Sequence, residues 1–136
     1  MTTLHKIVLA CCLGVLVPHP SHSQYIQKIS LNTGDSTDYY LAIPPLFGKT
    51  AGALVILVPF GRPEFMLPET RLHNIASVNK LLTIYASIGN GMLPGQQTLH
   101  RVGDLLAKVS STWHINADNF ALGGNDLAGT VALRYA

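Results

Sequence analysis

The feature that most constrains the fold is a pair of apolar stretches with a helix-length segment between them. Residues 53–58 carry no polar side chain, and residues 81–87 are nearly as apolar. Such runs are typical of strands that are covered on both faces, as in a parallel sheet. Residues 69–79 between them predict a helix, so the three segments together indicate one βαβ unit. A unit of this kind requires a right-handed crossover and predicts an α/β fold.

Further elements extend this pattern on both sides. Residues 25–31 and 38–43 predict two short strands, and the turn formers Asn32-Thr33-Gly34-Asp35 between them indicate a hairpin. A second helix is indicated by apolar side chains whose spacing places them on one helical face. These residues are Leu99, Val102, Leu105, Leu106 and Val109. After a turn at 116–119, we expect a buried strand at 120–122 and a helix from 127 to 136.

Taken together, the elements predict one α/β domain over residues 24–136, with a mostly parallel sheet and flanking helices. A hydrophobic content of 48% in 136 residues is sufficient for a buried core. The formal net charge is +2, and the charges are interspersed rather than gathered into a basic stripe. We therefore expect no nucleic-acid partner.

The first residues are typical of a secretory signal peptide. Lys6 precedes an apolar run at 7–17, and Ser21-His22-Ser23 provides small residues for cleavage after residue 23. The apolar run has eleven residues, against roughly 20 for a membrane-spanning helix. We therefore expect residues 1–23 to be a signal peptide and the protein to be exported, to a periplasm or outside the cell, without a permanent membrane span. The alternative is lipoprotein processing at Val8-Leu9-Ala10-Cys11.

Both cysteines, Cys11 and Cys12, lie within this signal segment. The mature chain would then have no thiol for a disulfide bond, a metal ion or nucleophilic attack. We expect no metal site and no cofactor.

The most informative motif lies at residues 119–130, where a short strand, a tight turn of small residues and a helix start follow one another. This segment resembles the nucleophile elbow of the α/β-hydrolase family, Gly-x-Ser-x-Gly, in which small residues permit a strained turn. The resemblance places Gly124 at the first glycine, Asp126 at the nucleophile and Ala128 at the second glycine, with Gly129 following. It implies an α/β-hydrolase-like, C-terminally truncated domain similar to secreted esterases, with a small-molecule substrate.

Aspartate in place of serine removes the hydroxyl on which an esterase depends. Haloalkane dehalogenases and epoxide hydrolases of the same fold carry a similar Gly-x-Asp-x-Gly-Gly elbow, and their aspartate attacks carbon to form an ester intermediate. A carboxylate is already ionised at neutral pH, so a histidine is needed only to activate the water that releases the product. In this family the histidine and its supporting acid follow the nucleophile in the chain. His73, His100 and His114 all precede it, and we interpret them as surface or capping residues.

The resemblance also implies an oxyanion hole made of two backbone N–H groups. One would come from Leu127, directly after the nucleophile position. The other would come from the loop at residues 59–63, where Gly61 or Arg62 could expose an N–H. A plain proline-rich connection is the alternative interpretation of that loop.

Three hypotheses of function remain open at this stage. The first is an exported hydrolase whose full-length form cleaves an ester or related bond, and whose present chain has no complete triad and is inactive alone. The second is a non-catalytic binding or scaffold domain with a degenerate elbow, in which Asp126 is a helix cap. The third is a doubly wound binding module with a ligand at the strand ends. Since a sheet cut after its central strands exposes an unpaired edge, we also expect association or poor solubility.

Overall fold

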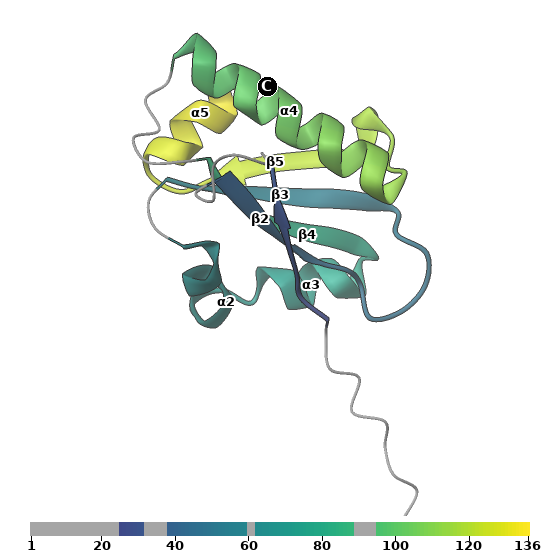
Figure 1. The fold of residues 1–136 in the computed structure, drawn as a ribbon. Helices are drawn as coiled ribbons and strands as arrows, with labels where there is room; N and C mark the ends of the chain where they lie inside the picture. The colour runs from purple at the N-terminus through teal and green to yellow at the C-terminus, as the bar shows by residue number, and fades with distance from the viewer. Residues whose placement is uncertain (1–24, 32–37, 60–61, 89–94) are drawn as a thin grey trace, which may run out of the picture.

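The computed structural model describes residues 25–31, 38–59, 62–88 and 95–136. In this part of the chain, five strands form one sheet with helices on both of its faces (Figure 1). The strands are β1 (Gln27–Ser30), β2 (Asp38–Ile43), β3 (Gly52–Val58), β4 (Leu81–Ile88) and β5 (Phe120–Gly124). Their order across the sheet is β1-β2-β4-β3-β5, so β5 is one edge.

The sheet is mixed. β1 pairs with β2 and β2 pairs with β4 in antiparallel fashion, whereas β3 is parallel to both β4 and β5. The α/β fold class and the predicted parallel pairing of the apolar strands are confirmed. β1 and β2 also pair as the predicted hairpin strands, although the expected turn at 32–35 lies outside the described residues.

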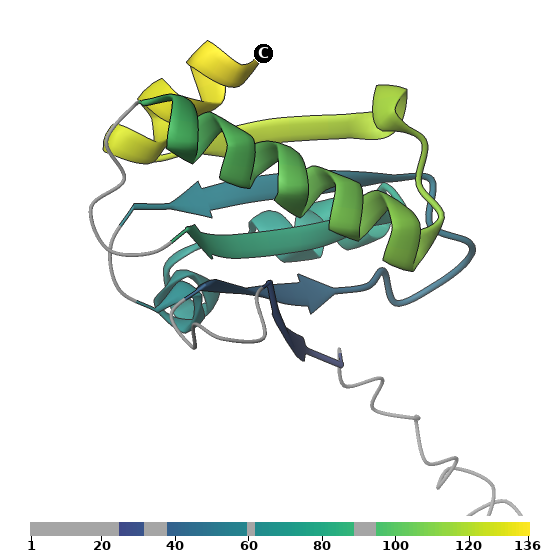
Figure 2. The same ribbon diagram turned by 45° about the horizontal axis from the view of Figure 1, so that its top comes forward.

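Two layers of helices cover the sheet. The short helices η1 (Pro63–Phe65), α2 (Met66–Glu69) and α3 (Leu72–Val78) lie on one face, and α4 (Gln96–Trp113) and α5 (Leu127–Tyr135) lie on the other. Figure 2 shows α4 lying across the strands. The single-turn helix η2 (Ala117–Asn119) leads into β5. The larger core fills the space between the sheet and the α4 and α5 layer, and a smaller apolar cluster lies under α2.

Helix α4 follows the predicted apolar stripe. Val102, Leu105 and Val109 are fully buried, and Leu99 and Leu106 pack partly buried against the same core. The helix ends at His114, which takes the left-handed conformation at φ 53° and ψ 46° and donates its N–H to the carbonyl of Ser110. His114 is therefore a capping residue, as expected.

The predicted helix over 69–79 is confirmed only from Leu72 to Val78, where α3 lies. Its expected first residue, Glu69, is instead the last residue of α2, and Thr70 is extended between the two helices at φ −132° and ψ 149°. Extended backbone suits a β-branched residue, and the Thr70 hydroxyl lies 3.3 Å from the carbonyl oxygen of Met66 and 3.0 Å from the hydroxyl of Tyr85. Helical structure also begins earlier than expected, because Pro63 fits the first turn of η1.

Among the described helices, none combines the length and the apolarity that a membrane crossing requires. The expected signal peptide at residues 1–23 lies outside the described residues.

Candidate functional site

The candidate site lies where β3 and β5 end. These neighbouring strands are parallel, and Leu57 pairs in register with Gly124. The loop that follows β3 and the turn that follows β5 therefore leave the sheet at the same edge, where α/β proteins commonly bind ligands. Gly61, expected in the first of these loops, lies outside the described residues, and Arg62 is exposed.

The turn after β5 places Asp126 in a strained backbone conformation. Its φ is 53° and its ψ is −127°. His114 has the same positive φ, but its ψ of 46° belongs to the left-handed helical region that other residues tolerate. The ψ of Asp126 instead lies close to a region that only glycine occupies readily, at a cost of about 1–3 kcal/mol for other residues.

Close backbone contact explains the small residues around this turn. A Cβ atom at Gly124 would lie 2.6 Å from the carbonyl carbon and 2.7 Å from the carbonyl oxygen of Ala128, and 2.9 Å from the nitrogen of Gly129. A Cβ atom at Gly129 would lie 3.0 Å from the oxygen of Gly124. The end of β5 and the first turn of α5 thus touch through their main chains, and side chains at these positions would push them apart.

Backbone hydrogen bonds hold the first turn of α5 in place, but they leave the N–H of its first residue unused. The Ala128 N–H donates to the carbonyl of Asn125 at 3.1 Å, and the Gly129 N–H donates to the carbonyl of Asp126 at 3.0 Å. None of the backbone hydrogen bonds of this turn uses the N–H of Leu127, which is the first residue of the helix.

The helix-cap interpretation of Asp126 is not supported by its side chain. Asp126 occupies the N-cap position of α5, yet its carboxylate makes no capping hydrogen bond. A capping residue normally has extended backbone, which directs its side chain toward the N–H groups of the first turn. The positive φ of Asp126 does not provide that conformation, and its side chain is exposed.

A hollow lies on each side of the turn. The first, of about 340 Å³, is on the α2 face and is lined by Ile56, Met66, Glu69, Thr70, Leu72, Gly124 and Asn125. The second, of about 260 Å³, is on the α5 face and is lined by Leu122, Gly123, Gly124, Gly129, Ala132, Leu133 and Ala136. Gly124 contributes to both, so the turn stands between two spaces into which a small molecule could extend.

A polar cluster fastens the segment after β3 to the β1 and β2 hairpin. The Tyr39 hydroxyl donates to Glu64 Oε2 at 2.6 Å, and Lys28 Nζ lies 3.6 Å from Glu64 Oε1 and 3.8 Å from the centre of the Tyr39 ring. Burial, the hydrogen bond to Glu64 and the charge of Glu64 raise the pKa of Tyr39 to about 12. Burial alone would raise the pKa of Glu64, but the Tyr39 hydrogen bond and the Lys28 charge outweigh it and lower that pKa.

None of the sequence patterns predicted this cluster, because its members lie far apart in the chain and each is common on a protein surface. A helpful signal would have been the register of the hairpin, in which Tyr39 pairs with Ser30. Because side chains alternate along a strand, Lys28, two residues before Ser30, lies on the same face as Tyr39.

The three histidines considered above do not hydrogen-bond to Asp126 within the described part of the chain. His100 and His114 are exposed, and His114 stands at the end of α4 that leads into the start of β5, away from the turn. His73 is half-buried on α3, and its Nδ1 has no hydrogen-bond partner among the described residues. Those residues also contain no group of three or more histidine, cysteine or carboxylate side chains that could hold a metal ion.

Comparison with solved structures relates this architecture to known enzymes. The acetyl xylan esterase of Aspergillus awamori superimposes with a TM-score of 0.61 at 9% identity, over 76% of this chain and 43% of the esterase. Over the matched residues, the fold of this chain resembles part of the fold of α/β-hydrolase esterases. A hyperthermophilic esterase from Pyrobaculum calidifontis matches with a TM-score of 0.58 and 16% identity, over 82% of this chain and 39% of that enzyme.

The S-formylglutathione hydrolase of Staphylococcus aureus is a further match, with a TM-score of 0.55 and 17% identity over 76% of this chain and 49% of the enzyme. This chain therefore spans less than half of the length of these α/β-hydrolase structures. No family model and no curated protein matches its sequence.

Proposed function

We propose that this chain carries the nucleophile elbow of an exported α/β-hydrolase-like protein whose full-length form hydrolyses an ester or related bond. The strained backbone of Asp126, held between Gly124 and Ala128, is the observation that supports this proposal most directly. Such strain persists only where the surrounding structure enforces it, and it is concentrated at functional sites. The export step rests on the sequence of residues 1–23 alone.

In this proposal Asp126 is the nucleophile. Its carboxylate oxygen forms a bond to a saturated substrate carbon, as in an alkyl halide or an epoxide, and the carbon–halogen or carbon–oxygen bond breaks with its electron pair going to the halogen or oxygen, which produces an ester on the side chain. Attack on the carbonyl carbon of an ester substrate would produce an anhydride instead, so with Asp126 as nucleophile the bond cleaved is the related one, at a saturated carbon. Water then adds to the carbonyl carbon of this ester, and the adduct expels the product as an alcohol and returns the carboxylate of Asp126. The Leu127 N–H, which has no backbone acceptor in the turn, donates to the oxygen that becomes negatively charged, and Gly61 is the expected second donor.

Release of the product requires a base that activates water. None of the described histidines bonds to Asp126, so the present chain is proposed to lack a complete triad and to be inactive alone. The missing groups would be a histidine and a supporting acid later in the full-length protein.

The second candidate is a non-catalytic relative in which the sheet and the turn survive as a binding or scaffold domain. The observation that favours it is the aspartate itself, since the chain resembles esterases in fold but has no serine at the elbow position. It differs from the first candidate in having no later histidine.

Reading the coding sequence downstream of the codon for Ala136, in all three frames, separates these candidates. A continuation that encodes further strands, an acid and a late histidine is expected from the catalytic proposal. A stop codon followed by no such continuation contradicts triad catalysis and favours the scaffold domain.

A further inference from the structure

The outer face of α3 is apolar and exposed. Leu72, Ile75 and Val78 follow one another at helical spacing and are 38%, 61% and 84% exposed. The opposite side of the same helix is already buried against the sheet through Ala76 and Ser77. A surface helix normally carries polar residues on its outer side, so this stripe, as exposed in the present chain, fits an apolar partner.

The loop between β2 and β3 extends the apolar surface at the end of α3. The Leu46 N–H donates to Ser77 Oγ at 2.9 Å, and the Ala51 N–H donates to the carbonyl of Lys80 at 2.9 Å. These two bonds hold the loop beside the last turn of the helix. Phe47, which this loop carries, is 65% exposed. We refer to Phe47, Leu72, Ile75 and Val78 together as the α3 patch.

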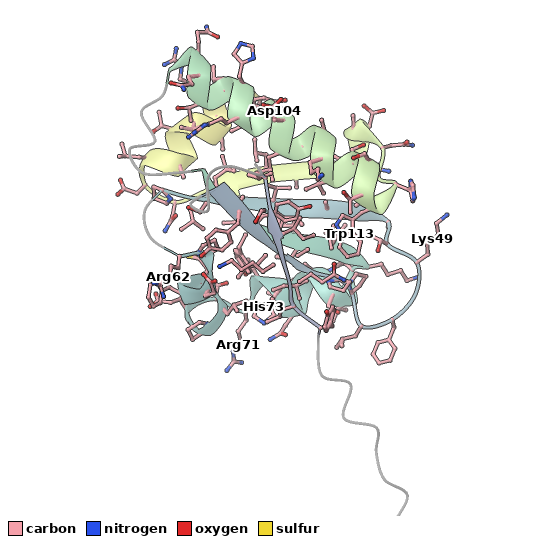
Figure 3. The ribbon with its side chains drawn as sticks, viewed as in Figure 1. Lys49, Arg62, Arg71, His73, Asp104 and Trp113 are labelled. Atoms are coloured by element: carbon pink, nitrogen blue, oxygen red, sulfur yellow. The ribbon has the colours of Figure 1, made fainter. Side chains whose placement is uncertain are left out.

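Cations lie next to the residues of the α3 patch in the chain. Arg71 directly precedes α3, Lys80 follows it, and Lys49 lies two residues after Phe47; all three are exposed. Figure 3 shows Lys49 and Arg71 directed away from the sheet, whereas Asp104 lies on α4 across the sheet. The segments 44–51 and 70–80 contain no aspartate or glutamate, and the exposed Glu69, which lines a hollow with Leu72, is a carboxylate beside the patch. The patch is therefore apolar at its centre, with three cations and one carboxylate at its margin.

We propose that the α3 patch binds the surface of an anionic lipid membrane. Exposed apolar side chains enter the boundary between headgroups and acyl chains, while the long stems of lysine and arginine let their charges remain among the headgroups. Anionic lipids attract such cations. A second copy of this chain is the less suitable occupant, because a two-fold pairing of this face would set Lys49, Arg71 and Lys80 against the same three cations.

Sedimentation with lipid vesicles tests this proposal, which does not depend on the proposed hydrolase function. The full chain is mixed with vesicles of phosphatidylcholine alone or with an equal share of phosphatidylglycerol. We expect binding to the anionic vesicles, weaker binding to the neutral ones, and a loss of binding as salt is raised.

Matched variants locate the binding surface. Val78→Asp should weaken binding about fivefold or more, whereas Leu133→Asp, at a residue that is 82% exposed on α5, should leave it unchanged. Lys80→Glu should weaken binding similarly, and Lys108→Glu on α4 should not. Circular dichroism of each variant verifies the fold.

Absence of sedimentation with anionic vesicles would overturn the proposal. Equal losses in the two members of either pair would also overturn it, because they would indicate a nonspecific effect of net charge. A third contrary result would be a dimer, detected by light scattering, that Val78→Asp converts to a monomer while vesicle binding is unaffected.

Discussion

A Cβ atom on Gly124 would lie 2.6 Å from the carbonyl carbon of Ala128, so β5 and α5 can meet as they do only with glycine at position 124. This contact sets how sharply the chain turns between the strand and the helix. Asp126 lies between the two residues and takes up the resulting strain in its own backbone, at φ 53° and ψ −127°. The predictions that follow test this contact, the strain and the chemistry proposed for the aspartate.

Replacing Gly124 by alanine should destabilise the fold by about 1–3 kcal/mol, because the added methyl group meets main-chain atoms that cannot rotate away. Urea unfolding gives the change in free energy. Gly103→Ala is the matched control. A Cβ atom there would meet only the Tyr135 side chain, at 3.5 Å, and alanine in the interior of α4 should stabilise by up to about 1 kcal/mol. Equal stability of the two variants would contradict the close contact at Gly124.

Replacing Asp126 by glycine should stabilise the protein by about 1 kcal/mol, since relief of the strain exceeds the entropy that glycine adds to the unfolded chain. Asp126→Ala keeps the strain but removes the carboxylate, and its free energy of unfolding should stay within about 0.5 kcal/mol of the wild type. If the carboxylate caps α5 instead, Asp126→Ala should lose about 1 kcal/mol. Both variants are compared by thermal and urea unfolding.

The Tyr39 hydroxyl should contribute stability that depends on pH. Because the pKa of Tyr39 is raised from 10.0 to about 12 in the folded protein, the contribution is complete below pH 10 and is lost as the pH rises toward 12. Tyr39→Phe should therefore cost about 1 kcal/mol at neutral pH, and the difference from the wild type should shrink between pH 10 and 12. A difference that stays constant across this range would contradict the role of the Tyr39 hydrogen bond to Glu64.

Several elements could be predicted because local pattern decides them. The strands β3 and β4 and the helix α4 could be predicted because their buried positions carry apolar residues in a pattern that is visible in the sequence. On α4 these residues are Val102, Leu105 and Val109. The start of α3 at Leu72, later than the expected residue 69, could not be found in this way. The break before it lies at Thr70, whose hydroxyl is 3.0 Å from the hydroxyl of Tyr85, 15 residues later in the chain.

The tight turn after β5 was predicted at the residues where the structure has it. Small residues at 124, 128 and 129 indicated a tight turn, and the structure gives the contact distances that require them. The preference of aspartate for helix N-caps predicts a capping role for Asp126. That preference applies to residues whose backbone is unstrained, which the backbone of Asp126 is not. The resemblance implied a strained turn, and the structure locates the strain at Asp126, where β5 packs closely against α5. The strand order, with β3 between β4 and β5, is a property of the assembled sheet.

The central claim, that the turn presents Asp126 as a nucleophile, can be tested on the present chain. A carboxylate that attacks carbon without a base to activate water should remain as an ester. The chain is incubated with a small alkyl halide and, separately, with a small epoxide, and intact mass and peptide mapping then locate any adduct.

Asp104→Asn, at an exposed aspartate on α4, controls for nonspecific alkylation, and Asp126→Asn removes the proposed nucleophile. The account predicts one alkyl group on Asp126, retained in Asp104→Asn and lost in Asp126→Asn. Labelling spread evenly over the exposed carboxylates, or none on Asp126, would contradict it.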